Sequence, residues 1–123
     1  MKIEIDGTPP SVNSAYFFVK QRGERIIKIK NTKAKEWVAK VHKVLEEVDY
    51  KTFEGNVVVH ITLYFNDHRK HDVDNYQKIT LDALTGAVWL DDDQIVRVTT
   101  EKFKAEERKT VVEVNASVGA LIG

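Results

Sequence analysis

Apolar and polar residues alternate along several segments of the chain with the two-residue period of β-strands. The longest of these segments, 56–65, is a run of β-branched and aromatic residues without a glycine or proline, which is typical of a central strand. The two segments on either side of Gly23 are separated by a short polar stretch, which predicts a hairpin. Strands are predicted at 1–6, 15–20, 25–30, 56–65, 94–103 and 110–118.

Two further segments carry the spacing of amphipathic helices. The first covers about 32–48, with Thr32 as its predicted N-cap. The second begins at Asp74, where Asp74 and Gln77 predict a capping box, and Gly86 has the position of a residue that ends a helix. The order β-β-β-α-β-α-β-β predicts an α+β fold, in which two helices pack on a mixed sheet.

The composition adds limits to this fold. A length of 123 residues suits a single domain, and 42% hydrophobic with 31% charged residues is typical of a soluble globular protein. The chain has no cysteine, which excludes disulfides, thiolate zinc sites and cysteine nucleophiles. No segment has the length of a membrane span, and charges occupy the first residues, where a signal peptide is apolar. We therefore expect one domain, residues 1–123, in the cytoplasm.

Charge is unevenly distributed, although the formal net charge is zero. Residues 1–35 contain eight Lys or Arg and three Asp or Glu, whereas residues 72–95 contain one Lys and six Asp. Such a distribution suits a protein whose basic segment binds an anion and whose acidic segment binds a cation. Both segments could instead be ordinary solvated surface, and composition alone favours this structural interpretation.

The acidic segment contains two groups of aspartates. Asp72 and Asp74 are two residues apart, so in an extended segment their side chains point to the same face. Close carboxylates raise each other's pKa unless a cation lies between them, and Mg²⁺ is typically held by a few carboxylates, water and a substrate phosphate. The second group, 91–93, follows a helix and begins a strand that could lie beside the strand ending near Asp72. The two groups could therefore meet.

Each of these residues also has a purely structural interpretation. Asp74 could be only a helix cap, and 91–93 could be only a solvated turn. Lys78 lies one helical turn from Asp74 and from Asp82, so it could form an ordinary salt bridge. Alternatively, its ammonium could face a scissile phosphate, where negative charge builds up in the transition state.

The same residues resemble the core signature of the RusA-type Holliday junction resolvases. That signature, D-x-D-N-x-x-K-x-x-x-D-A-L…W-x-D-D-x-Q, is present between Asp72 and Gln94 and specifies many positions. The stretch Pro-Pro-Ser-Val-Asn at 9–13 resembles the family's segment near the N-terminus. The elements between the motifs fit in order and length, so we expect the resemblance to cover the whole chain.

The resemblance implies a Mg²⁺-dependent endonuclease. By position, Asp72, Asp74 and Asp92 match the family's metal ligands, and Lys78 matches its essential lysine. The resemblance also implies a homodimer that binds four-way junction DNA and cuts two strands of like polarity at two symmetric sites. The residues at DNA-contacting positions are Ser11, Asn13, Ser14, Arg69, Lys70, His71 and Asn75.

The chain departs from the family pattern at two places. The family often has a solid block of Arg and Lys before the first aspartate, whereas 67–71 holds only two permanent positive charges here. The additional Asp93 leaves open which of Asp91, Asp92 and Asp93 faces the metal. Two alternative functions stay open as well. One is a metal-dependent nuclease of the same fold that acts on other branched or single-stranded DNA, and the other is a junction-binding protein that does not cut.

Overall fold

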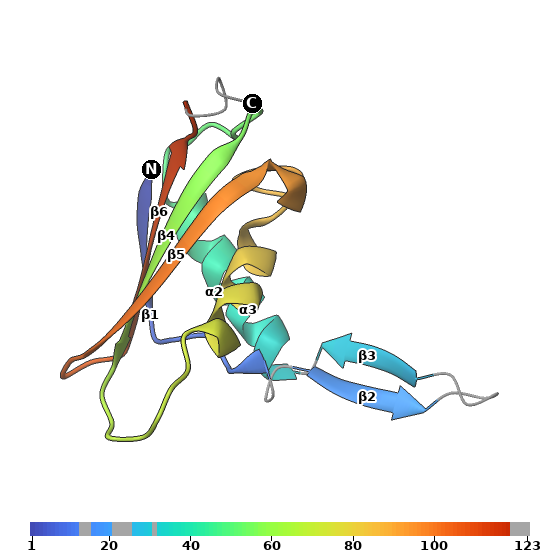
Figure 1. Cartoon of the computed structure of the whole chain (residues 1–123), viewed down its shortest axis with the longest axis vertical. Helices are drawn as coiled ribbons and strands as arrows, with labels where there is room; N and C mark the ends of the chain where they lie inside the picture. Colours follow the sequence, from blue (N-terminus) through green and yellow to red (C-terminus); the bar gives the residue numbers. More distant parts are fainter. Residues whose placement is uncertain (13–15, 21–25, 31, 119–123) are drawn as a thin grey trace.

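The computed structural model describes residues 1–12, 16–20, 26–30 and 32–118. Its framework is a four-stranded sheet that carries two helices (Figure 1). Along the chain the elements are β1 (Lys2–Asp6), β2 (Tyr16–Lys20), β3 (Ile26–Lys30), α2 (Thr32–Glu46), β4 (Val57–Phe65), α3 (Asp74–Leu84), the short 3₁₀ helix η1 (Asp92–Gln94), β5 (Ile95–Lys104) and β6 (Lys109–Ala116).

The strand order of the sheet is β1-β6-β4-β5. β6 is antiparallel to both of its neighbours, β1 and β4, whereas β4 and β5 are parallel. Parallel neighbours need a crossover connection, and α3 provides it between β4 and β5. β2 and β3 pair only with each other, as an antiparallel ribbon (Figure 1).

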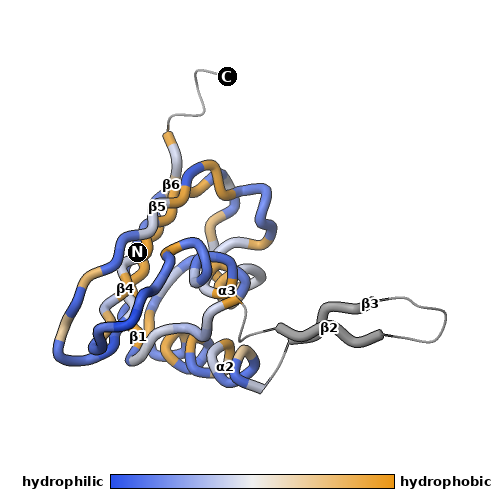
Figure 2. The backbone as a smooth tube through the Cα atoms, turned by 60° about the horizontal axis from the view of Figure 1, so that its bottom comes forward, coloured by the Kyte–Doolittle hydropathy of each residue, from blue (hydrophilic) through white to orange (hydrophobic). Residues whose placement is uncertain are grey.

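The core lies between the sheet and the helices. α2 and α3 lie side by side over one face of the sheet (Figure 1, Figure 2). Along β4 every second residue is buried, which is the pattern of a strand with one covered face. The residues that β4 buries are Val57, Val59, Ile61, Leu63 and Phe65. α2 packs Trp37 and Val41 into the same core, and α3 adds Ile79.

The predicted fold class and the order of elements are confirmed, and the observed boundaries lie within two residues of the predicted ones. The hairpin is confirmed over 16–20 and 26–30, while Ala15 and Arg25 lie outside the described residues. Gly86 has a positive φ of 96° directly after the end of α3, a conformation that favours glycine. In the described ranges, no helix combines the length and the apolar character that crossing a membrane requires.

The predicted capping box at the start of α3 is wrong. The residue before the helix is Val73, and no side chain caps the helix there. Gln77 instead accepts a hydrogen bond from the Thr100 hydroxyl at 2.8 Å, because α3 lies against β5. The first helix also differs slightly from its prediction, since Thr32 is already helical and α2 ends at Glu46.

Candidate active site

Two of the predicted carboxylates lie at the N-terminal end of α3. Asp72 belongs to the turn before the helix, where its carbonyl oxygen accepts from the Asn75 N–H at 3.0 Å. Asp74 is the first helical residue. Both side chains are exposed, and neither forms an ion pair within the part of the chain that the structure describes. The helix dipole favours negative charge at this end, so the position stabilises two carboxylates.

Asp92 lies at the opposite end of α3. β4 and β5 are neighbours, as expected, but they run parallel, so Ile95 at the start of β5 pairs with Val57 at the start of β4. The strand after Asp92 therefore does not begin beside the end of β4. A helix rises about 1.5 Å per residue, which places Thr85, the hydrogen-bond partner of Asp92, about 16 Å along the axis from Asp74.

The turn before β5 gives Asp91 a structural role. Its carboxylate accepts from the Asp93 N–H at 2.9 Å, while the Gln94 side-chain oxygen accepts from the Asp91 N–H at 3.0 Å. These two bonds form a capping box around η1. The Gln94 amide also donates to the carbonyl oxygens of Phe53 and Gly55, at 2.9 and 2.7 Å. η1, and not α3, therefore begins with a capping box.

The Asp92 carboxylate is positioned by a chain of hydrogen bonds from the core. Trp89 is fully buried, and its indole N–H donates to the Thr85 hydroxyl oxygen at 2.9 Å. That hydroxyl donates in turn to Asp92 Oδ1 at 2.7 Å. Of the three adjacent aspartates, only Asp92 is held in this way and directed toward α3. Of the three, Asp92 is the one that lines the groove along α3.

Lys78 lies on α3 between the two acidic groups. Its ammonium is 3.3 Å from Asp82 Oδ2, and the lysine side chain is 56% exposed. A shallow groove of about 340 Å³ along this helix face is lined by Asp74, Lys78, Asp82 and Asp92. Three of the four predicted catalytic residues thus share one groove, although Asp74 and Asp92 lie toward its two ends.

The described carboxylates do not form a complete Mg²⁺ site by themselves. Among the described residues, no three side chains of His, Asp or Glu are grouped closely enough to hold one ion. Mg²⁺ keeps several waters and often binds through only one or two carboxylates and a substrate phosphate. The prediction that Asp72 and Asp74 share a face is wrong, because Val73 between them has an α-helical and not an extended backbone, and the two aspartates line different cavities. Asp92 is not grouped with them either. The shared three-aspartate site stays a prediction.

A polar network fixes the loop that carries Asp72. His71 Nε2 lies 2.7 Å from Asp67 Oδ1, and Nδ1 lies 2.7 Å from the Tyr76 hydroxyl. Because a carboxylate only accepts, Nε2 carries the proton of the neutral ring. The imidazole also stacks on Phe65, with centroids 3.8 Å apart and ring planes 4° from parallel. His71 is only 11% exposed, so its ring is part of the loop's internal structure.

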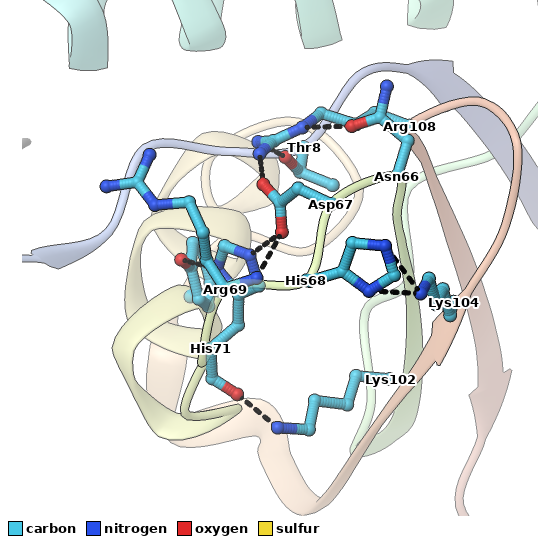
Figure 3. A network of polar contacts seen from close by, with 10 residues as sticks. Thr8, Asn66, Asp67, His68, Arg69, His71, Lys102, Lys104 and Arg108 are labelled. Carbon is cyan, nitrogen blue, oxygen red and sulfur yellow. Dashed lines mark hydrogen bonds and ion pairs between the residues drawn. The ribbon is translucent and has the colours of Figure 1, made fainter.

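Arg108, from the turn between β5 and β6, completes this network (Figure 3). Its guanidinium lies 2.6 Å from Asp67 Oδ2 and also donates to the Thr8 hydroxyl at 3.0 Å and to the Asn66 side-chain oxygen at 3.1 Å. Figure 3 shows the Arg69 guanidinium pointing away from Asp67. Arg108 therefore ties the loop before α3 to the N-terminal proline segment, and Arg69 is left for other contacts.

A cavity of about 640 Å³ lies beside this network. It brings together predicted DNA-contacting residues that are far apart in the sequence. Those that line it are Ser11, Arg69, Lys70, His71 and Asn75. Asp72 lines the same cavity, so a candidate metal ligand lies next to the candidate DNA contacts. Asn13 and Ser14 lie outside the described residues.

The lining of this cavity has an excess of positive charge. The cations are Lys33, Lys40, Arg69, Lys70 and Arg108, and the carboxylates are Glu36 and Asp72. We call this cavity the basic cleft. Phosphate contacts by Lys and Arg dominate the affinity of proteins for DNA, and a concave basic surface is suited to them.

A family model described as Endodeoxyribonuclease RusA matches residues 6–115. The chain belongs to this family. The matched region contains the Pro-Pro-Ser segment, both cavities and the whole β4-α3-β5 unit, so the resemblance inferred from the motifs is confirmed. Membership in the RusA family implies an endodeoxyribonuclease. No curated protein matches the chain.

Sequence reasoning missed three residues that shape this RusA-family site. Asp67 and Arg108 are 41 residues apart, and nothing in the local sequence indicates that they pair. Thr85 lies inside the signature region, but its role depends on a turn that brings residues 85, 89 and 92 together. A search for polar residues one turn beyond a helix end could have found Thr85, whereas the Asp67–Arg108 pair required the structure.

Replacement of Thr85 with Val should destabilise the protein. The substitution leaves the buried Trp89 N–H without an acceptor, which costs about 1–3 kcal/mol, and it removes the donor to Asp92. Urea unfolding of the variant would measure the loss. Thr85→Ser keeps the hydroxyl and should stay within about 1 kcal/mol of the wild type. Equal stability of the Val variant and the wild type would contradict the importance of this chain of hydrogen bonds.

Acid should weaken the Asp67 network in a defined pH range. The hydrogen bond from His71 is the main reason that the pKa of Asp67 falls from 3.8 to about 2, and the Arg69 N–H and Arg108 lower it further, partly offset by burial. A carboxyl whose pKa is lower in the folded state stabilises the fold above its unfolded pKa. This stabilisation should be complete above pH 4 and be lost as the pH falls toward 2. Acid unfolding of the wild type and of Asp67→Asn should therefore differ most above pH 4.

Proposed function

We propose that this RusA-family protein is a Mg²⁺-dependent endonuclease that resolves four-way DNA junctions by paired incisions. The proposal is carried by one observation. Candidate DNA contacts from separate segments line one basic cleft, and a candidate metal ligand, Asp72, lines it too. Asp74 follows directly on α3. A DNA backbone held in the cleft would therefore have a phosphate near Asp72, while Asp74 lines the neighbouring groove along α3.

Each residue near the scissile phosphate has its own role. Arg69 and Lys70 bind the backbone, and Asp72 and Asp74 would hold the metal. When bound, Mg²⁺ supplies positive charge beside the phosphate and a water of lowered pKa. Lys78, one turn along α3, stabilises negative charge in the transition state. We assign Asp92 as the third carboxylate of the site, because a buried tryptophan and a threonine hold it in the same groove as Asp74.

The proposal includes a homodimer. A four-way junction is resolved by cuts in two strands of like polarity, which requires two active sites related by a two-fold axis. Sedimentation at micromolar concentration should therefore give twice the mass of one chain. A monomer that resolves junctions with undiminished paired cutting would contradict this part of the proposal.

The decisive experiment uses a synthetic four-way junction with each strand labelled in turn, with and without Mg²⁺. Two symmetric nicks in strands of like polarity should form only with Mg²⁺, and a linear duplex of the same sequence should stay intact. Equal cleavage of flaps or single strands would indicate a nuclease of broader specificity. Junction binding without cleavage at any divalent metal would indicate a protein that only binds.

A further inference from the structure

One face of α2 is directed into the basic cleft. Lys33, Glu36, Trp37 and Lys40 follow one another at spacings of three, one and three residues, which is one face of a helix, and all four line the cavity. Residues 69–72 form part of the rest of the lining. The cleft therefore has a helical wall that is separate from the loop before α3.

The cations of the cleft are mostly unpaired. Within the described ranges, Lys33, Lys40, Arg69 and Lys70 form no ion pair, and Lys33 and Lys40 are exposed. Three lysines outside the cleft have carboxylate partners, in Lys2–Glu113, Lys78–Asp82 and Lys109–Glu4, whereas Lys35 and Lys43 of α2 have none among the described residues. Unpaired cations gathered around one cavity repel each other, and an anionic ligand would relieve this repulsion.

Lys40 and Trp37 both contact the rest of the fold. The Lys40 ammonium lies against the N-terminal loop, 3.1 Å from the point where a side-chain carbon at Gly7 would be. Trp37 is 4% exposed, and its buried indole N–H has no partner among the described residues.

We propose that α2 is a second DNA-binding wall, in which Lys33 and Lys40 each contact a backbone phosphate of the DNA presented to Asp72. The ligand class is a phosphodiester chain, because Lys33 and Lys40 are seven residues apart on α2, about 10 Å along the helix axis, which is too far for one small anion. The inference rests on the proposed function, which places DNA in this cleft. It adds contacts from a helix on which sequence reasoning placed none.

The salt dependence of binding tests this proposal. Each phosphate neutralised by a lysine contributes about one unit to the slope of log affinity against log salt concentration. The double variant Lys33→Ala, Lys40→Ala should therefore bind a four-way junction more weakly, with a slope about two units shallower than that of the wild type. The matched control is Lys35→Ala, Lys43→Ala, which removes the same charge from exposed positions of α2 outside the cleft.

Binding is measured by fluorescence anisotropy in EDTA, on a junction and on a linear duplex, so the result does not depend on cleavage. An unchanged slope in the Lys33, Lys40 variant, or an equal change in the control, would overturn the inference. A wild-type protein that binds junctions but never cuts them contradicts the proposed function, and the slope comparison still decides the role of α2. A wild-type protein that binds neither DNA would overturn both.

Discussion

Replacement of Asp72 or Asp74 with Asn should abolish junction cleavage and leave junction binding unchanged or stronger. Asn keeps the size of the side chain but removes the charge that holds a divalent cation. It also removes repulsion between the carboxylate and DNA phosphates, which explains the expected gain in binding. Both side chains are exposed and unpaired within the described part of the chain, so folding should be unaffected. Cleavage on a labelled junction and anisotropy in EDTA measure the two effects separately.

Asp92 provides the third arm of this experiment. If it is a ligand of the same site, Asp92→Asn should abolish cleavage to the same degree. Asp91→Asn is the matched control, because the Asp91 carboxylate serves as a cap of η1. Because Asn caps helices about as well as Asp, Asp91→Asn should keep a stability close to that of the wild type and a nearly normal cleavage rate. Wild-type rates in all three variants, Asp72, Asp74 and Asp92, would contradict the metal mechanism. A normal rate in the Asp92 variant alone would restrict the site to the N-terminal end of α3.

Replacement of Lys78 with Ala should lower the single-turnover cleavage rate by about two to three orders of magnitude, as is typical when one donor to a transition-state charge is removed. Junction affinity should change little, because one phosphate contact is a small part of the total. The salt bridge to Asp82 predicts a different result. An exposed helical pair of this kind contributes only about 0.3–0.5 kcal/mol to stability, so its loss would hardly change the rate.

Asp82→Asn separates these two roles of Lys78. It breaks the same salt bridge while keeping the ammonium in place. If Lys78 acts on the transition state, only Lys78→Ala should lose activity. If the salt bridge is its whole role, the two variants should have similar, nearly normal rates and a similar small decrease in melting temperature. Rates and melting temperatures measured on both proteins would therefore decide the role of Lys78.

The elements of this fold could be predicted from the sequence because each depends on local periodicity. The run of β-branched and aromatic residues at 56–65 identified β4, and the spacing of apolar residues after Thr32 identified α2. The capping box was assigned to the wrong helix because Asp74 and Gln77 have the right spacing, whereas Gln77 is engaged by Thr100 from β5. Such competition between partners depends on tertiary structure and leaves no local signal.

The candidate site was predictable in its residues but only partly in its arrangement. The signature named Asp72, Asp74 and Asp92, and the structure adds that parallel pairing of β4 and β5 puts the third aspartate at the far end of α3. The basic cleft was the least predictable part. Its charge comes from Lys33, Lys40 and the loop before α3, and only the packing of α2 brings these cations together.

The strand order has a consequence for the timing of folding. β6 lies between β1 and β4, and it pairs Glu113 with Lys2, which is more than one hundred residues away in the chain. Contacts at such separation form slowly because a long loop must first be closed. Arg108, which ties the Asp72 loop to the proline segment, directly precedes β6. During synthesis, the βαβ unit that carries the aspartates can therefore form before the basic cleft is complete. In a growing chain, the aspartates would be positioned first and the basic cleft would be completed last.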